Sequence, residues 1–387
     1  MRVLIAFDKF KGSLTAPEAC DLAARALRDR HRRWQFDLCP LTDGGEGFVN
    51  ILTRAAGGQT VPFKAMGPRG GLVDASLGVV FAPNIPKSAR ALLRLPDRAL
   101  RSNPTIAVVE MAAASGLHLL PSGQYDPWQT TTFGTGQLIR VAAEMGAAQI
   151  VVGVGGSATI DLGLGALAAL GLEFRSVAGG KIRPPVPARW ERIAGVEGET
   201  FHSIPPLRVA CDVTNPLLGK NGAAAIYGPQ KGLLPDDLLR FEAAMRRMAR
   251  LLCDYCGQPS RLTGTPGTGA AGGLPFGLLV AARARLVAGF ALVSAWLDLP
   301  ARISAADIVI TGEGAFDETS LTGKGPGAVA TKARTLGKAV HVFAGRLGVT
   351  APGKGWHLHP ITPSGCPLER AQREAPEWLA RSVRAAF

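Results

Sequence analysis

Short apolar runs rich in branched residues recur along this chain, and several of them end in a loop of glycine and charged residues. Val3 to Phe7 is the first such run, and the loop Asp8 to Ser13 follows it directly. The next residues predict a helix that continues to about Arg30, with Pro17 in its first turn, where the missing N–H costs nothing. Strands that alternate with helices in this way are typical of a parallel α/β sheet.

The strand–helix pattern occurs at both ends of the chain and is interrupted between them. Strands are predicted at 36–41, 308–311 and 340–344, whereas 73–81 alternates like a strand of an antiparallel sheet. The length of 387 residues suggests two domains. We predict a Rossmann-like parallel α/β domain built from residues 1–65 and 291–387, and an inserted mixed α/β domain formed by residues 66–290.

The chain is basic, with a formal net charge of +13. Much of this charge lies in two clusters, residues 25–33 and 87–101, which read as solvated helix faces or loops. No basic stretch is interleaved with aromatic residues, as nucleic-acid-binding modules would need. We therefore expect small-molecule substrates, with no nucleic-acid partner, and a monomer or homodimer. A basic binding protein without catalysis stays the alternative.

Residues 150–172 are long and apolar enough to resemble a membrane span. Six glycines and the polar residues Ser157, Thr159 and Asp161 interrupt them, so a strand, a glycine loop and a small-residue helix explain the segment better. The N-terminal apolar run has only five residues, which is short for a signal peptide. The six cysteines are scattered, with Cys253 and Cys256 the one close pair. We expect a cytoplasmic protein without membrane association.

Six predicted strand ends carry the glycine and polar residues. They are 8–13, 42–47, 153–157, 211–216, 264–273 and 312–317. In open α/β sheets, ligands bind beyond the carboxyl ends of the strands. Glycine lets backbone N–H groups approach an oxyanion, whereas nearby carboxylates repel a phosphate unless a cation lies between them. The combination of these loops with Asp43, Glu46, Asp212 and Glu313 suggests phosphate together with Mg²⁺.

Each of these features has a structural alternative. Asp-Gly and Gly-Glu-Gly are common in turns, and Asp161 and Asp317 are candidates for helix caps. No Gly-Lys pair precedes Ser or Thr, so a Walker A loop is absent from the sequence. Gly153-x-Gly155-x-x-Ala158 fits a relaxed dinucleotide fingerprint, with Glu173 further on, which leaves a nicotinamide-dependent oxidoreductase acting on a small hydroxy acid as an alternative.

Several motifs, in order along nearly the whole chain, resemble those of bacterial glycerate kinases. They are VLIAFDKFKGSLTA (3–16), PLTDGGEGF (40–48), EMAAASGL (110–117), TTFGTGQLI (131–139), VGVGGSAT (152–159), ACDVTNPLLGKNGAAAIYGPQKG (210–232), GTGAAGGL (267–274) and ITGEGAFDETSLTGK (310–324). Several positions depart from the family pattern. A Gln expected shortly after Asp317 is Glu318 or Thr319 here. Ile160 stands where Asn is often found, Leu162 where Gly is, and Ala315 where Arg is.

The resemblance implies two α/β domains, one of them discontinuous, with the active site in the cleft between them. It also implies a kinase that uses ATP and Mg²⁺ to phosphorylate D-glycerate, with 2-phosphoglycerate as the usual product. The missing arginine at Ala315 removes one candidate phosphate ligand.

We assign roles to loop residues on this basis. Asp212 or Asp43 accepts the proton of the glycerate hydroxyl, and Lys9 and Lys11 stabilise negative charge. Substrate contacts are expected from Ser13, Asn215 and Lys324. The residues expected to cradle ATP phosphates are Gly155, Gly156, Ser157, Gly269, Gly272 and Gly273, and those expected to hold Mg²⁺ are Glu46, Glu313 and Asp317.

Overall fold

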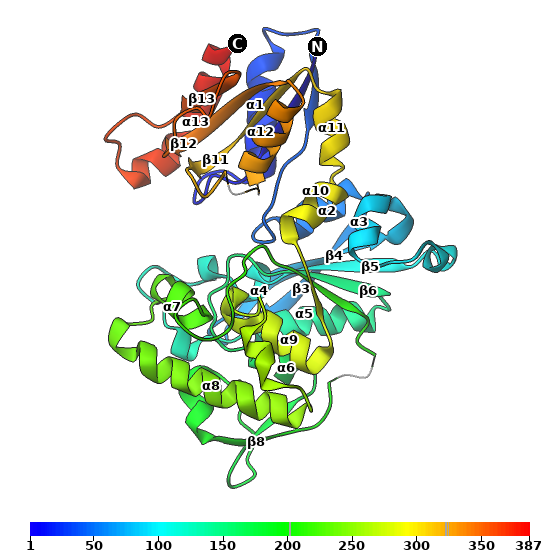
Figure 1. The fold of residues 1–387 in the computed structure, drawn as a ribbon, viewed down its shortest axis with the longest axis vertical. Helices are drawn as coiled ribbons and strands as arrows, with labels where there is room; N and C mark the ends of the chain where they lie inside the picture. The colour runs from blue at the N-terminus through cyan, green and yellow to red at the C-terminus, as the bar shows by residue number, and fades with distance from the viewer. Residues whose placement is uncertain (201–202, 322, 324) are drawn as a thin grey trace. The chain divides into compact units, whose positions relative to one another are not determined.

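Both ends of the chain contribute strands to one sheet of five parallel strands. The computed structural model describes residues 1–200, 203–321, 323 and 325–387, and it gives this sheet the strand order β13-β12-β11-β1-β2 (Figure 1). β1 pairs with strands on either side of it, so that Val3 faces Phe36 and Ile308. The strands are β1 (Arg2–Phe7), β2 (Gln35–Leu38), β11 (Ile308–Phe316), β12 (Ala339–Leu347) and β13 (Trp356–Pro360).

Helices pack against the terminal sheet as two groups. α1 (Ala16–Arg28) contacts α13 (Leu368–Ala386), and α11 (Leu299–Ala305) contacts α12 (Gly325–Thr335). Every residue of β1 after Arg2 is buried, as expected for a central parallel strand that is covered on both faces. α1 begins with a capping box, because Thr15 and Glu18 each accept a hydrogen bond from the other's backbone N–H.

A second sheet of six strands is mixed. Its order is β10-β9-β6-β5-β4-β3, with antiparallel pairing of β3 with β4 and of β4 with β5, and parallel pairing elsewhere. Its strands are β3 (Gln59–Met66), β4 (Leu72–Phe81), β5 (Thr105–Glu110), β6 (Gln149–Gly153), β9 (Leu207–Ala210) and β10 (Arg285–Val287), and β7 (Glu173–Ser176) pairs with β8 (Ile193–Glu197) in a separate ribbon. The predicted α/β class, with one parallel and one mixed sheet, is confirmed.

Helices of the second sheet's unit enclose a large apolar core that includes Trp190, Phe241 and Phe276. The helices are α2 (Phe48–Ala55), α3 (Lys87–Leu92), α4 (Ala112–Ser115), α5 (Phe133–Glu144), α6 (Leu164–Ala169), α7 (Ala223–Tyr227), α8 (Leu238–Tyr255) and α9 (Leu274–Ala282). α10 (Gly289–Trp296) begins in this unit and ends in the terminal one. Residues 150–172 form most of β6, a glycine loop and α6, as the sequence predicts. No helix in the described parts of the chain is long and apolar enough to cross a membrane.

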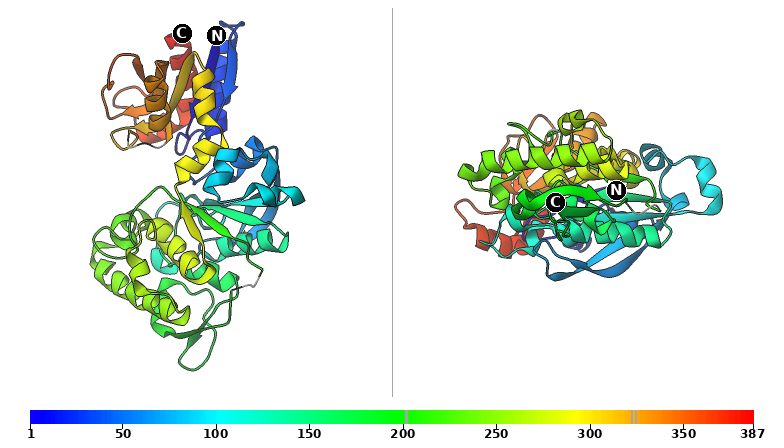
Figure 2. Two further views of the ribbon diagram at one scale, coloured as in Figure 1. Left: turned by 45° about the vertical axis from the view of Figure 1, so that its right-hand side comes forward. Right: turned by 90° about the horizontal axis from the view of Figure 1, so that it is seen from below.

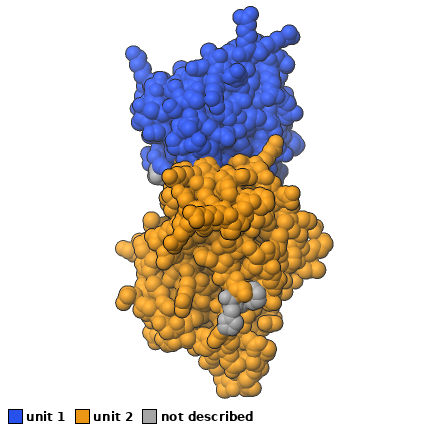
Figure 3. Space-filling model, turned by 90° about the vertical axis from the view of Figure 1, so that its right-hand side faces the viewer, with its two compact units in different colours: residues 1–43, 293–387 blue, residues 44–292 orange. Residues whose placement is uncertain are grey.

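Contacts divide the chain into two units, residues 1–43 with 293–387 and residues 44–292 (Figure 3). The two ends of the chain, blue and red in Figure 2, belong to the same unit. Residues 44–65 were expected with the terminal segments but lie in the other unit. The reason is that β3 forms a hairpin with β4, and α2 contacts β4 and β5.

Candidate active site

Two acidic side chains meet at the carboxyl ends of β1 and β11. Asp8 follows β1, and Glu313 lies near the end of β11. The chain leaves β1 toward β2 and leaves β11 toward β12, on opposite sides, so the pair marks the topological switch point of this sheet. Ligands of open parallel sheets bind at such points.

Both carboxyl groups are held in surroundings that disfavour their charge. Burial raises the pKa of Asp8 to about 6. The positive charge of Lys9 opposes this shift, and the negative charge of Asp43 adds to it. Burial likewise raises the pKa of Glu313 to about 7. A hydrogen bond with Ser320 opposes this shift, and the negative charges of Asp8, Asp317 and Asp43 add to it. The Oε1 atom of Glu313 is buried and has no hydrogen-bond partner among the described residues. A cation at this position would offset the accumulated negative charge.

Lys9 lies beside the acidic pair and forms an ion pair with Asp43. Its Nζ atom is 3.2 Å from Asp43 Oδ1, and its backbone N–H donates to Asp8 Oδ1 at 2.7 Å. About half of the Asp43 side chain is exposed. The structure thus brings together Lys9 and Asp43, both predicted as catalytic residues, with Asp8, which the sequence analysis left out of the site.

The carboxylate of Asp317 accepts a hydrogen bond within the turn after β11. The Thr319 hydroxyl donates to Asp317 Oδ1 at 2.6 Å, and this bond is the main cause that lowers the pKa of Asp317. The positive charge of Arg346 lowers it further. In the β11–β12 register, Arg346 pairs with Ala315, the residue that stands where the family motif often has arginine. The neighbouring strand therefore supplies an arginine directly opposite that position.

Ser13 and Lys11 are tied to the first turns of α13. The Ser13 hydroxyl donates to the carbonyl oxygen of Gln372 at 2.6 Å, and Gln372 Nε2 donates to the carbonyl oxygen of Lys11 at 3.2 Å. The side chain of Lys11 is left exposed. Lys324, predicted as a substrate contact, lies outside the described residues.

Asp212 and Asn215 belong to the other unit, in the loop after β9. Both carboxylate oxygens of Asp212 accept from the backbone N–H of Phe290, at 2.8 and 3.0 Å, in the first turn of α10. The Asn215 amide accepts from the Tyr227 hydroxyl at 2.6 Å and donates to the carbonyl oxygen of Asn221 at 2.9 Å. Both side chains therefore hold backbone or loop structure, whatever else they bind.

The predicted phosphate-cradling glycines differ in their surroundings. Gly155 donates its N–H to the carbonyl oxygen of Gly44 at 3.0 Å, and a Cβ on it would lie 2.7 Å from the backbone of Gly45. Gly156 has φ +72° and faces Glu46, whose Oε1 atom would lie 3.7 Å from an added Cβ. These glycines let the loop after β6 lie against the loop that precedes α2.

Gly269, Gly272 and Gly273 are all buried. A Cβ at Gly272 would lie 2.0 Å from the carbonyl oxygen of Thr159, and one at Gly269 equally close to that of Pro216. Leu162 donates its N–H to the Gly272 carbonyl oxygen at 3.0 Å and has φ +56°, a conformation that favours glycine. Close packing of backbone on backbone explains these glycines.

Ser157 is held by a lysine that is itself buried. Lys231 Nζ donates to Ser157 Oγ at 2.6 Å and to the carbonyl oxygen of Thr159 at 2.9 Å. Burial lowers the pKa of Lys231 to about 7, although the nearby Asp161 opposes this shift. The Asp161 carboxylate accepts bonds from the N–H and hydroxyl of Thr132 and from the N–H groups of Gly163 and Gly165, so it caps the start of α6 as the structural alternative predicted.

Glu46 is exposed, with His118 Nδ1 3.5 Å from its Oε1 atom. It belongs to the unit of residues 44–292, whereas Glu313 and Asp317 belong to the other unit. Within the described parts of the chain, no three His, Cys, Asp or Glu side chains are grouped to hold a metal ion. The residue that the structure places beside Glu313 is Asp8.

Three residues that bear on the site were missed from sequence. Asp8 directly follows a predicted strand, and side chains at the carboxyl ends of strands commonly contact ligands, so its place in the sequence could have identified it. Lys231 and Arg346 carried no signal, because nothing local distinguishes a buried lysine or a strand-end arginine from surface residues. Conversely, Glu173, the ribose ligand of the dinucleotide alternative, begins β7 and pairs with Arg175 and Lys181, which gives that alternative no support.

Comparisons with known proteins agree with the motifs. The model of the glycerate kinase family matches residues 3–387. The chain is 36% identical to a glycerate kinase of Bacillus subtilis (strain 168) over 391 residues, covering 99% of this chain and 96% of that protein. It is 35% identical over 358 residues to the glycerate 2-kinase of Escherichia coli (strain K12), covering 90% and 86% of the two chains.

A solved structure also resembles the whole chain. It comes from Salmonella typhimurium LT2, is described as a glycerate kinase 2, and superimposes with a TM-score of 0.76 at 36% identity. The match covers 100% of this chain and 97% of that chain. The chain therefore belongs to the glycerate kinase family.

Proposed function

We propose that this protein transfers the γ-phosphoryl group of ATP to D-glycerate, that 2-phosphoglycerate is the product, and that Mg²⁺ assists the transfer. Family membership supports the reaction class. The observation that carries the proposal is the buried acidic pair at the switch point, where Glu313 Oε1 has no partner among the described residues.

The residues at this point fit a magnesium ion. Mg²⁺ prefers oxygen ligands and is commonly held by one or two carboxylates together with substrate phosphates. Asp8 and Glu313 supply two carboxylates whose burial favours a cation, and they would hold the ion. When bound, Mg²⁺ supplies positive charge to the phosphate oxygens.

The chain's own residues supply the remaining steps. Lys9 stabilises charge beside Asp43, and Lys11 is exposed and able to contact an anion. Asp43 or Asp212 accepts the proton from the glycerate hydroxyl as that oxygen attacks the γ-phosphorus. Gly156 and Ser157 present the loop after β6 to an oxyanion. Gly269, Gly272 and Gly273 lie outside the proposed site because they are packed within the chain.

The proposal is tested by coupled measurement of ADP release with D-glycerate, L-glycerate and hydroxypyruvate as acceptors. We expect turnover with D-glycerate that depends on Mg²⁺, and a phosphorus NMR spectrum of the product that shows phosphate on the 2-hydroxyl. Phosphate on the 3-hydroxyl would correct the regiochemistry alone. Oxidation of NADH with hydroxypyruvate, without ADP release, would favour the oxidoreductase alternative.

A further inference from the structure

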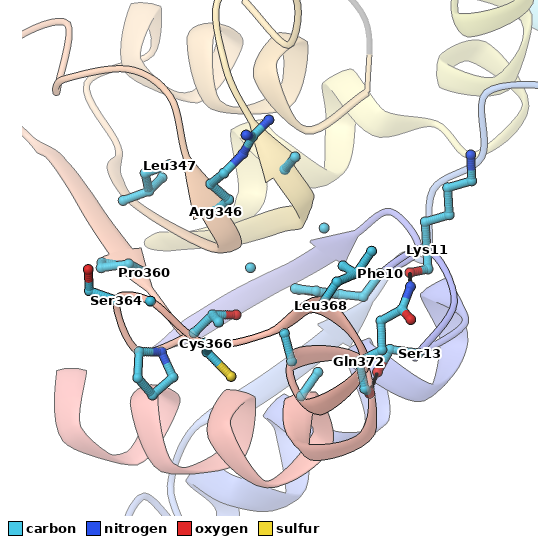
Figure 4. A pocket seen from close by; sticks show the side chains of 18 residues that line it. Phe10, Lys11, Ser13, Arg346, Leu347, Pro360, Ser364, Cys366, Leu368 and Gln372 are labelled. Carbon is cyan, nitrogen blue, oxygen red and sulfur yellow. Dashed lines mark hydrogen bonds between the residues drawn. The ribbon is translucent and has the colours of Figure 1, made fainter. Parts of the chain in front are cut away.

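The terminal unit contains a cavity of about 830 Å³, and of its lining residues only Lys11 and Ser13 have been given a role above. Its walls come from the loop after β1, the ends of β11 and β12, the loop of residues 360–366 and the first turns of α13 (Figure 4). This volume is within the range of pockets that take drug-sized ligands, roughly 300–1,000 Å³.

The charge of the cavity selects for an anion. Lys11 reaches it from the loop after β1 and Arg346 from β12, and Figure 4 shows them on two sides of the space. None of its 18 described lining residues is acidic. Arginine and lysine in this arrangement favour a ligand with phosphate or carboxylate groups.

Much of the remaining lining is apolar. Phe10, Leu347, Pro360, Leu368 and Ala371 present carbon surface to the cavity. D-glycerate is too small to fill this space and has almost no apolar surface to bury. A planar base and a ribose, with an anionic tail, match both the size and the chemistry of the lining.

The cavity adjoins the acidic pair. Gly314, which lines it, directly follows Glu313, and Phe10 is two residues beyond Asp8. We propose that this cavity binds the adenine nucleotide, with the base and ribose against Phe10 and Leu347 and the phosphates toward Arg346 and Lys11. This inference rests on the proposed function and specifies where its nucleotide binds, in the terminal unit rather than on the glycine loops predicted from sequence.

Cys366 provides a reporter, because it lies half-buried in the cavity wall. The full-length protein is alkylated with N-ethylmaleimide, alone and with ADP, D-glycerate or inorganic phosphate, and the rates are followed by peptide mass mapping. Cys256, half-buried on the other unit, is the internal reference. We expect ADP at about ten times its Kd to slow Cys366 alkylation about tenfold and to leave Cys256 unchanged.

A pair of variants tests the charge. Arg346→Ala should raise the Kd for ADP about tenfold, since a charge-assisted contact to phosphate is lost. Arg373→Ala is the matched control, because Arg373 is an exposed arginine of α13 that pairs with Glu374 and does not line the cavity. Its Kd for ADP should be unchanged.

The outcomes separate this inference from the proposed function. Unprotected Cys366 in a preparation that phosphorylates D-glycerate overturns the nucleotide assignment and leaves the function in place. Protection by D-glycerate but not by ADP also overturns it. Protection by ADP in a preparation with no phosphoryl transfer supports the nucleotide site and removes the proposed function.

Discussion

Lys231 Nζ lies 2.6 Å from Ser157 Oγ, which links a buried lysine to the glycine loop after β6. The same ammonium group donates to the carbonyl oxygen of Thr159, so one side chain fixes two positions of the loop. Replacing it with Met would leave both acceptors unpaired in a buried site. We expect Lys231→Met to lower the free energy of unfolding by about 2–3 kcal/mol, measured by urea denaturation.

Two further variants test whether Lys231 positions the loop after β6 for catalysis or only stabilises the folded chain. Lys231→Arg keeps a donor near Ser157 and should recover part of both stability and kcat, whereas Ser157→Ala removes one bond and should cost about 1 kcal/mol. If Lys231→Met retained wild-type kcat and KM while folded, the lysine would have no role in positioning the loop for catalysis.

Glu313→Gln should stabilise the metal-free protein at high pH and abolish most activity. Because folding raises the pKa of Glu313 from 4.5 to about 7, the folded chain keeps a proton that the unfolded chain loses between these values. The free energy of unfolding of the wild-type protein therefore falls as the pH rises from 4.5 to about 7, and it stays at its lower value above that range. The variant should be more stable than wild type by about 3 kcal/mol near pH 8 and equal near pH 4, by urea denaturation in EDTA.

Binding of Mg²⁺ should weaken as the acidic pair takes up protons. The pKa values of Asp8 and Glu313, about 6 and about 7, imply that both are charged only above neutral pH. We expect calorimetric affinity for Mg²⁺ to fall about tenfold or more between about pH 8 and pH 5.5.

The control for this metal measurement is Glu377→Gln, which removes an exposed glutamate of α13. Its affinity for Mg²⁺ should follow that of the wild-type protein, whereas Asp8→Asn and Glu313→Gln should each bind weakly at every pH. Unchanged affinity in both site variants would place the ion elsewhere.

The two candidate proton acceptors are distinguished by their asparagine variants. The true base should lose about 10²–10⁴-fold in kcat when replaced, together with the acidic limb of the pH–rate profile. Asp212→Asn has an additional cost of about 1 kcal/mol in stability if the cap on α10 weakens. A variant with near-normal kcat removes that residue as the base, and the urea midpoint shows whether Asp212 acts only as a cap.

Much of the fold follows from the local pattern of apolar and polar residues. The apolar run Val3 to Phe7 and the alternation of 73–81 predict a buried parallel strand and an antiparallel strand, and both are confirmed. β3 and α13 were not predicted. Each contains a proline, Pro62 and Pro376, which weakens the strand or helix pattern, and contacts with the rest of the unit decide their structure.

The sequence predicts which segments contribute to the site, but it does not predict which of their side chains lie next to one another. Glycine and acid at predicted strand ends identify 8–13 and 312–317, although β11 continues to Phe316 instead of ending at Thr311. The pairing of β1 with β11 brings these segments together. That Asp8 lies beside Glu313 depends on the long-range pairing of β1 with β11. The packing roles of Gly269 and Gly272 likewise depend on neighbours far away in the sequence, which no local spacing reveals.

The pairing of β1 with β11 also bears on biosynthesis. The Thr311 hydroxyl donates to the carbonyl oxygen of Ala6, a bond that spans 305 residues of chain. During translation, β1 emerges early with only β2 and α1 nearby, whereas residues 44–292 can complete their own core before β11 is made. One hydrogen-bonding edge of β1 must therefore stay unpaired until β11 has been made, and an unpaired strand edge is a place where another chain can add a strand.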